Sequence, residues 1–179
     1  CSGLEFRRVL FRSIHEFSLD FQVVTHDIMP VDGEYLLTLE IFEPQYHSET
    51  FTDFDFYGRP YTNSYNVFDG YRFSRAIVAG FDAGGELRWD NYLPYRNLLT
   101  MDLAPKLAIH PIGYGEMVLL YLSDGAIGSR IITGEKETAP LEYAPQELMW
   151  PEDKLLTETK GRIRNWYDQY FLAGGYQEV

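Results

Sequence analysis

Apolar and polar residues alternate along much of the chain, and this pattern predicts β-strands. Apolar residues occupy every second position in residues 17–24 and again in residues 35–41, which places them on one face of a sheet. Residues 29–33 lie between the two runs. There Pro30 fixes φ and Gly33 accepts a positive φ, so the chain can reverse. The pattern therefore predicts a first antiparallel hairpin.

Two further hairpins are predicted by short breaks that contain Asp and Gly. The first break is residues 82–85 and the second is residues 123–125. In each, an Asp side chain can hydrogen-bond its own backbone and a glycine can adopt positive φ, as tight turns between paired strands require. The flanking strands are expected at residues 72–81, 86–93, 116–122 and 126–133.

Turn glycines recur along the chain at Gly33, Gly85 and Gly125. A recurrence of about 40 to 50 residues is typical of the blades of a β-propeller. We therefore predict an all-β fold in which an antiparallel meander forms propeller-like blades, that is, a partial β-propeller. The remaining expectations are an extended connection at residues 140–151, at most one short helix or a surface turn at residues 153–160, and a strand at residues 165–173.

A long aromatic and acidic segment spans residues 42–71, whereas structureless loops rarely exceed about 12–15 residues. It predicts a protruding hairpin that turns at residues 57–60. Aromatic rings beside carboxylates can stack on and hydrogen-bond a sugar or a peptide, which makes this hairpin the candidate ligand site. The interpretation that we favour is structural, a twisted hairpin that buries its aromatic side chains across the strands. The candidate ligand-binding residues are Tyr46, Asp53, Asp55, Tyr57, Tyr61 and Tyr65.

The residue pattern gives little support to metal or cofactor chemistry. Asp53 and Asp55 lie two apart, so both carboxylates would face one side of a strand and could share Ca²⁺. A calcium-binding loop of the helix–loop–helix type needs further oxygen ligands and a glycine at fixed offsets, and these are absent. No phosphate loop, dinucleotide fingerprint, helical zinc motif or Gly-x-Ser-x-Gly elbow occurs. We therefore predict no metal site, no cofactor and no catalytic residue.

One segment combines a strand, an Asp/Gly turn, a second strand and a tryptophan, an order found in many propeller blades. Gly80 lets neighbouring strands approach closely, and Asp82 and Gly85 shape the turn. Leu87 and Trp89 lie two apart on one strand face and can wedge between blades. Structural roles are also predicted for Asp124, Gly125 and Trp166.

Four strings carry a resemblance to a known family: residues 68–72 (FDGYR), 76–82 (AIVAGFD), 87–91 (LRWDN) and 166–177 (WYDQYFLAGGYQ). Together they resemble the C-terminal part of propeller-like proteins of Bacteroidota. The resemblance implies an exported protein that is periplasmic, outer-membrane-associated or secreted. It also implies a C-terminal strand pair and further N-terminal blades of the same chain as partners, and it supplies no catalytic residue.

The beginning of the chain resembles a translated sequencing adaptor. Residues 7–13 back-translate into a common short-read library adaptor, and residues 4–13 fit the same reading frame. We therefore expect residues 1–13 to be non-native and residues 14–179 to be a fragment of one β-propeller-like domain. With Cys1 outside the native part, no disulfide is expected.

The charge and hydropathy of the chain argue against binding to nucleic acid and against a transmembrane segment. The net charge is −12, and without residues 1–13 the chain is more acidic still. Such a balance repels phosphate backbones, so nucleic acid is not an expected partner. The longest clean apolar run, residues 117–122, is far short of the roughly 20 residues that span a bilayer, so no transmembrane segment is expected.

Three functional interpretations remain. The leading one is a non-enzymatic binding or scaffold module that meets a protein or a glycan through its aromatic hairpin. The second is a carbohydrate-active enzyme fragment, in which carboxylate pairs such as Asp20 with Asp27, or Glu43 with Asp69, act across a cleft. In the third, the hairpin only completes a neighbouring blade. Carboxylates that converge in a pocket favour the enzyme, and dispersed carboxylates contradict it.

Overall fold

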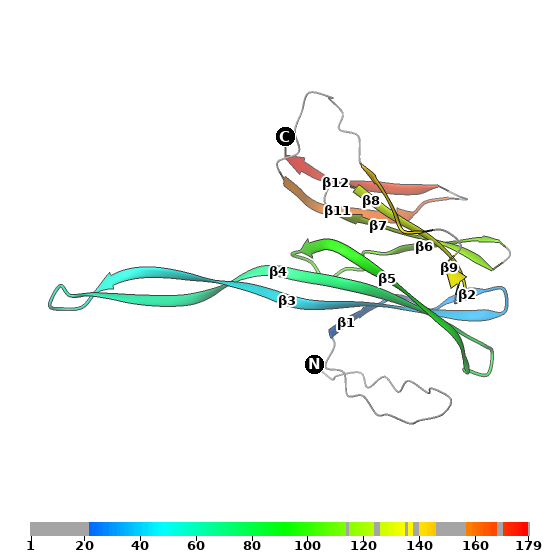
Figure 1. The fold of residues 1–179 in the computed structure, drawn as a ribbon, viewed down its shortest axis with the longest axis horizontal. Coiled ribbons are helices and arrows are strands. Elements are labelled where there is room, and N and C mark those ends of the chain that lie inside the picture. The colour runs from blue at the N-terminus through cyan, green and yellow to red at the C-terminus, as the bar shows by residue number, and fades with distance from the viewer. Residues whose placement is uncertain are drawn as a thin grey trace.

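The computed structural model of the chain describes residues 22–113, 115–123, 126–134, 136–137, 140–145, 157–167 and 170–178 (Figure 1). All regular structure in these residues is β-strand, and every strand pair is antiparallel, which confirms the all-β prediction. The expected adaptor, residues 1–13, lies outside the described part. The strands are β1 (Gln22–Thr25), β2 (Met29–Val31), β3 (Glu34–Phe54), β4 (Pro60–Phe81), β5 (Leu87–Thr100), β6 (Ala108–Gly113), β7 (Glu116–Ser123), β8 (Ala126–Thr133), β9 (Lys136–Glu137), β10 (Glu142–Pro145), β11 (Thr157–Asn165) and β12 (Phe171–Glu178).

The first sheet joins β1, β3, β4 and β5 in that order, with β2 also paired to β3. The turn from β2 to β3 lies between Val31 and Glu34, which are partners in register. Asp32 and Gly33 have φ angles of 49° and 85°, as a two-residue type I′ turn requires. The predicted reversal is therefore confirmed. Residues 17–21 of the first predicted strand lie outside the described part of the chain.

The hairpin from β4 to β5 turns at Asp82, as the sequence predicts. Asp82 N donates to Glu86 O, and Gly85 N donates to Asp82 O, both at 3.0 Å. The Asp82 carboxylate also accepts the backbone N–H groups of Gly84 and Glu86, at 2.8 and 2.9 Å. The hydrogen bond from the Glu86 backbone is the largest cause of the lowered pKa of Asp82, because it stabilises the charged form. The Asp82 side chain is therefore part of the turn.

The second sheet joins β6, β7, β8 and β10, with β9 also paired to β8. β7 and β8 form the third predicted hairpin, whose last described pair is Ser123 with Ala126. The two turn residues, Asp124 and Gly125, lie outside the described residues. Both large sheets are open meanders in the described part of the chain, and each follows the sequence order of its main strands.

β11 and β12 form a C-terminal strand pair, as the resemblance implies, and the strand expected at residues 165–173 is divided between them: residue 165 ends β11 and residues 171–173 begin β12. The chain reverses there, because Trp166 N donates to Tyr170 O at 3.0 Å. The rings of Trp166 and Tyr167 pack edge to face with centroids 4.7 Å apart. The aromatic side chains that suggested a strand therefore contact one another in a turn.

Two other predictions near the C-terminus change as well. Residues 157–160 belong to β11, so the described part of the segment 153–160 is a strand and not a helix or a surface turn. Residues 153–156 lie outside the described part. Residues 140–151 were expected to form an extended connection, and their described part includes β10, which pairs with β8.

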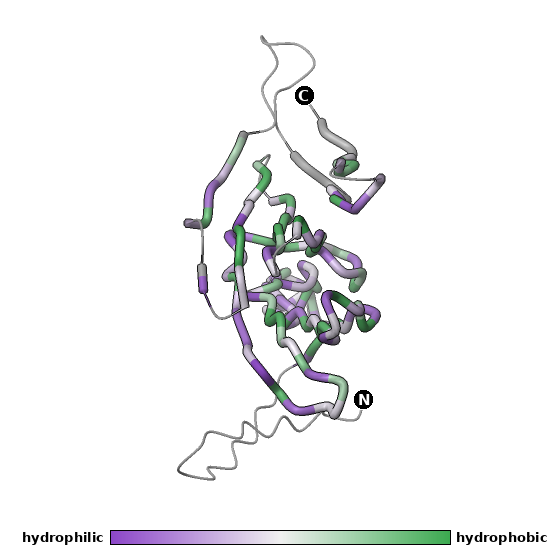
Figure 2. The backbone as a smooth tube through the Cα atoms, turned by 90° about the vertical axis from the view of Figure 1, so that its right-hand side faces the viewer, coloured by the Kyte–Doolittle hydropathy of each residue, from purple (hydrophilic) through white to green (hydrophobic). Residues whose placement is uncertain are grey.

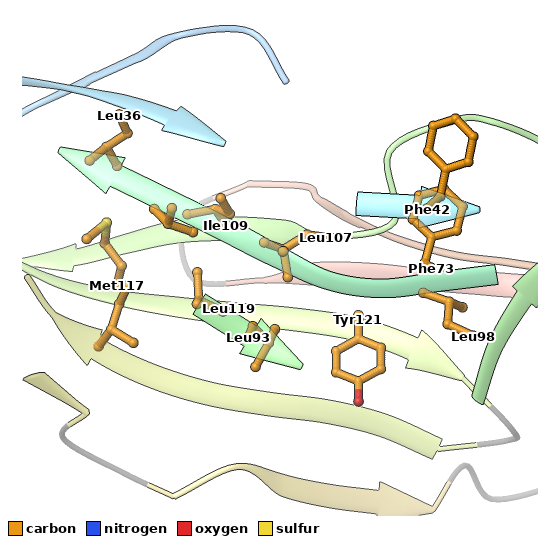
Figure 3. Packing of buried hydrophobic residues seen from close by; sticks show 13 residues of the cluster. Leu36, Phe42, Phe73, Leu93, Leu98, Leu107, Ile109, Met117, Leu119 and Tyr121 are labelled. Carbon is orange, nitrogen blue, oxygen red and sulfur yellow. The ribbon is translucent and has the colours of Figure 1, made fainter. Parts of the chain in front are cut away.

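A hydrophobic core lies between the first and second sheets (Figure 3). Phe73, Val78 and Leu93 of the first sheet and Leu119 and Tyr121 of the second are almost completely buried. β11 packs against β6 and β7, so the C-terminal pair lies beside the second sheet (Figures 1 and 2). The fold is thus a stack of open antiparallel sheets, in which one apolar layer holds the two large sheets together.

Candidate functional site

The long hairpin of β3 and β4 leaves the first sheet as an arm, defined here as residues 43–70 (Figure 1). β1 pairs with β3 only as far as Phe42, and β5 pairs with β4 only as far as Tyr71. Beyond these residues no other described strand borders the hairpin. The prediction of a protruding hairpin is confirmed, and its arm has two unpaired edges within the described part of the chain.

The tip of the arm is a tight turn organised by Asp55. Asp55 N donates to Arg59 O, and Gly58 N donates to Asp55 O, both at 2.9 Å. The Asp55 carboxylate accepts the backbone N–H groups of Tyr57 and Arg59, at 2.9 and 2.8 Å. Gly58 has a φ of 74°, as this loop type requires. Asp55 therefore shapes the turn in the same way as Asp82 does, and its hydrogen bonds lie within the protein.

The aromatic side chains of the arm are exposed, which contradicts the favoured interpretation that the hairpin buries them. Phe56 is 95% exposed and Tyr57 is 76% exposed. No described strand of the second sheet is recorded against the arm, and the recorded ring contacts are with residues of the same hairpin. Tyr46 packs on Phe68 with centroids 5.4 Å apart. The other exposed rings are Phe51, Phe54, Tyr61 and Tyr65.

One face of the arm carries a row of hydrogen-bonded side chains. His47 Nδ1 lies 2.5 Å from Asp69 Oδ1, and His47 Nε2 lies 3.3 Å from Glu49 Oε1. Tyr65 OH donates to Glu49 Oε2 at 2.5 Å. Further along, Tyr61 OH donates to Asp53 Oδ2 at 3.1 Å. The row links Tyr65 of the predicted site to three groups outside it, Asp69, His47 and Glu49, and Tyr61 and Asp53 form a separate pair beside them.

The row shifts the pKa values of its members in directions that strengthen it. The hydrogen bond to Asp69, followed by the bond to Glu49, raises the pKa of His47. The bond from Tyr65 lowers the pKa of Glu49, and the same bond raises the pKa of Tyr65. These shifts favour a protonated imidazole between two carboxylates. The alternation of His47, Glu49 and Phe51 with small polar residues is the sequence signal that could have revealed this row.

The opposite face of the arm is uncharged along its middle. Its side chains alternate with the row described above and are small hydroxyl or amide groups. Ser48 is paired with Asn66, Thr50 with Ser64 and Thr52 with Thr62. The two faces therefore differ strongly in charge.

A buried carboxylate is the most connected polar group of the described core. Glu40 is fully buried and accepts hydrogen bonds from Tyr95 OH at 2.7 Å, Lys106 N at 2.8 Å and Leu107 N at 3.0 Å. His26 Nε2 lies 2.5 Å from Glu40 Oε1. Glu40 thus holds the segment before β6 against the first sheet. A charged residue inside the apolar run of residues 36–42 is the sequence signal that was missed.

A cavity of about 310 Å³ lies beside His26. Leu36, Leu107 and Ile163 give it apolar walls, and Asp27 is the acidic residue in its lining. A pair of converging carboxylates, as glycoside hydrolysis requires, is therefore lacking in this lining. In the described chain no group of three or more His, Cys, Asp or Glu side chains could hold a metal ion.

The carboxylate pairs considered for the enzyme are engaged separately. Glu43 accepts a hydrogen bond from Gln45 Nε2 at 3.1 Å, whereas Asp69 pairs with His47. Asp20, the expected partner of Asp27, lies outside the described residues. The one pair that the structure describes in full, Glu43 with Asp69, thus lies on the exposed arm and not in a cleft.

Comparisons of the chain with protein families, with curated proteins and with solved structures found no match. Among the described residues no helix is long and apolar enough to cross a membrane. The fold alone therefore defines the class of the protein: an antiparallel all-β protein of stacked open sheets with a projecting two-stranded arm.

Proposed function

We propose that the chain is a non-enzymatic binding module that engages a partner protein with its arm. The observation that carries this proposal is the exposure of large aromatic side chains at the tip, where Phe56 is 95% exposed. Aromatic residues and arginine dominate the binding energy of protein interfaces. At the tip Arg59 lies over the ring of Tyr57, 5.4 Å from its centroid, so both types occur in one small surface.

The stability of the arm supports the same proposal. An isolated two-stranded hairpin is marginally stable at best in water, because neither face is covered. The arm extends beyond the neighbouring strands β1 and β5 and carries several exposed rings. A partner that covers one face would remove apolar surface from water and stabilise the ribbon.

The polar groups of the arm favour a protein over a glycan. A sugar site needs carboxylates that are free to accept from sugar hydroxyls and rings that offer an open face. Asp53 and Glu49 already accept hydrogen bonds from Tyr61 and Tyr65. The ring of Phe51 also meets the ring of Tyr65 edge to face, with centroids 5.9 Å apart.

We also propose that the two large sheets are blades of a propeller-like protein exported by a bacterium. The support for blades is that each sheet is an antiparallel meander and that the two share one apolar core. The support for export is the sequence resemblance to propeller-like proteins of Bacteroidota. In this setting the arm reaches beyond the stacked blades.

The test is site-specific photo-crosslinking in a lysate, followed by reconstitution with the purified candidate partner. A crosslinker at Phe56 is compared with one at Tyr92, which is exposed on β5 in the body of the protein. The partner captured only from position 56 is then titrated against Phe56→Ser and Tyr92→Ser. We expect the first variant to weaken binding at least about tenfold and the second to leave it unchanged. Equal binding by the two variants, or binding to a glycan array that depends on Tyr61, would contradict the proposal.

A further inference from the structure

We propose that the free edge of β3 in the arm binds an extended, positively charged segment of a partner protein as an additional β-strand. This inference rests on the proposed function, because it takes the arm as the binding element. It adds the mode of binding and the chemistry of the segment that binds.

The hydrogen-bond pattern of the arm determines which backbone groups point outward. Asp55 N donates to Arg59 O at 2.9 Å, so this is a hydrogen-bonded pair. From there the register between the strands is unbroken from residue 54 back to residue 46 of β3. Hydrogen-bonded and non-hydrogen-bonded pairs alternate in an antiparallel ladder. The residues whose N–H and C=O groups therefore point away from β4 are Tyr46, Ser48, Thr50 and Thr52.

These outward groups form a template for another strand. Among the described strands, β1 reaches β3 only at residues 39–42, so the edge from Tyr46 to Thr52 has no strand beside it. The next outward N–H, that of Phe54, donates to the Asp53 carboxylate at 2.8 Å. The free edge therefore ends at Thr52. An unpaired row of this kind accepts an extended peptide through main-chain hydrogen bonds.

The two edges of the arm are not equivalent. On β4 the outward position next to the turn is Pro60, which has no N–H to donate. On β3 the stretch from Tyr46 to Thr52 contains no proline. The β3 edge also carries the acidic side chains Glu49 and Asp53, so we assign the partner strand to β3.

The charge of β3 defines the chemistry of the partner strand. Residues 34–58 contain no Lys or Arg, and the acidic Glu43, Glu49 and Asp53 outnumber His47, the one histidine of this stretch. Directly opposed residues of opposite charge stabilise a strand pair, and like charges destabilise it. A basic segment therefore fits this edge. A second copy of the arm would place acidic side chains against each other and is disfavoured.

The two faces of β3 specify how the partner residues alternate. Glu49 and Asp53 lie on one face, and Ser48, Thr50 and Thr52 lie on the other. A strand with Lys at every second position and small hydroxyl residues between them matches both faces. The probe is therefore an acetylated, amidated decapeptide of alternating Thr and Lys, with a Thr–Glu peptide as its control.

The test titrates this peptide into the isotope-labelled full chain and follows backbone amides by NMR. We expect the amides of Ser48, Thr50 and Thr52 to become at least about tenfold more protected from hydrogen exchange. The Thr–Glu peptide should leave them unchanged. The same protection with both peptides, or protection with neither, overturns the proposal.

A pair of proline variants tests the edge itself. Thr50→Pro removes one outward N–H without removing a bond between β3 and β4, and should weaken peptide binding at least about fivefold. Ser64→Pro is the matched control, because Ser64 is the cross-strand partner of Thr50 and its backbone N–H points away from β3. Ser64→Pro should bind the Thr–Lys peptide with the same affinity as the unmodified chain. Equal affinity of the two proline variants overturns edge pairing at β3.

A charge exchange gives a second variant in case proline disturbs the arm. Glu49→Lys with Asp53→Lys should abolish binding of the Thr–Lys peptide and create binding of the Thr–Glu peptide. If the double variant does not exchange its peptide preference, the proposal is overturned. A different result would contradict the proposed function: a purified partner that binds Phe56→Ser as well as it binds the unmodified chain.

Discussion

Trp89 lies directly across from Gly80 and covers it. The two residues are partners in the β4–β5 ladder, and a Cβ added to Gly80 would lie 2.4 Å from Trp89 Cε2. Trp89 Nε1 donates to Glu34 Oε2 at 2.8 Å, which fixes the indole ring. The ring also lies near Gly134, which directly follows β8. The tryptophan thus packs between the first and second sheets, and only a glycine leaves it this space.

Gly80→Ala is therefore expected to destabilise the protein. The added methyl group meets an indole ring that a hydrogen bond holds in place, and such overpacking costs about 1–3 kcal/mol. The free energy of unfolding, measured by urea denaturation, tests this. Gly174→Ala is the matched control, because a Cβ there meets nothing within 4 Å. If both variants are equally stable, the contact between Gly80 and Trp89 is not tight.

Glu40→Ala is expected to be one of the most damaging single substitutions in the described core. It leaves Tyr95 OH and the backbone N–H groups of Lys106 and Leu107 without their buried acceptor. Each buried donor that is left without its acceptor costs about 1–3 kcal/mol, so the total loss should be about 3 kcal/mol or more. Thermal and urea unfolding measure the loss. Glu43→Ala, in the exposed part of the same strand, should change stability by less than about 0.5 kcal/mol, and a similar loss in both would refute this role of Glu40.

How much of the fold and of the candidate site could be predicted from the sequence differs between elements. The turns at Gly33 and Asp82 were predictable because their chemistry is local: a glycine with positive φ and an Asp that bonds its own backbone. Whether Phe56 and Tyr57 are buried was not predictable. That depends on whether a second layer covers the hairpin, which is a non-local property. The role of Glu40 likewise depends on Leu107, which is distant in the sequence.

Asp102 is expected to make stability depend on pH in acid. Burial raises the pKa of Asp102, but hydrogen bonds from Lys106 and Arg162 outweigh this and lower it from 3.8 to about 2. A lowered folded-state pKa means that the contribution is complete above pH 3.8 and is lost as the pH falls toward 2. Because Asp102 is partly exposed, Asp102→Asn should lose only about 1 kcal/mol at pH 7.

The measurement for Asp102 is urea unfolding of the unmodified chain and of Asp102→Asn across this pH range. The difference between them should shrink below pH 3.8 and be lost as the pH falls through the folded-state pKa of about 2. Asp90→Asn, an exposed change on β5, serves as the control and should show little difference at either end. A difference for Asp102→Asn that stays constant with pH would contradict the role of the ion pairs.

His47 is expected to titrate above its ordinary pKa of 6.5, chiefly because of its hydrogen bond to Asp69. Asp69→Asn should therefore lower the pKa of His47, which an NMR titration of the imidazole signals measures. A raised folded-state pKa means that the row of side chains is strongest below pH 6.5 and weakens as the pH rises through the folded-state value. Asp27→Asn is the control, and equal titration of His47 in both variants would show that the row does not form.

The central claim is that residues 43–70 form an ordered ribbon whose β3 edge is free, and residue-resolved amide hydrogen exchange of β3 tests it most directly. In the isolated protein we predict an alternation: slow exchange at His47, Glu49 and Phe51, whose N–H groups point toward β4, and fast exchange at Ser48, Thr50 and Thr52. Uniformly fast exchange would show that the arm is not an ordered hairpin. Uniformly slow exchange would show that its edge is already covered, and either result would contradict the account.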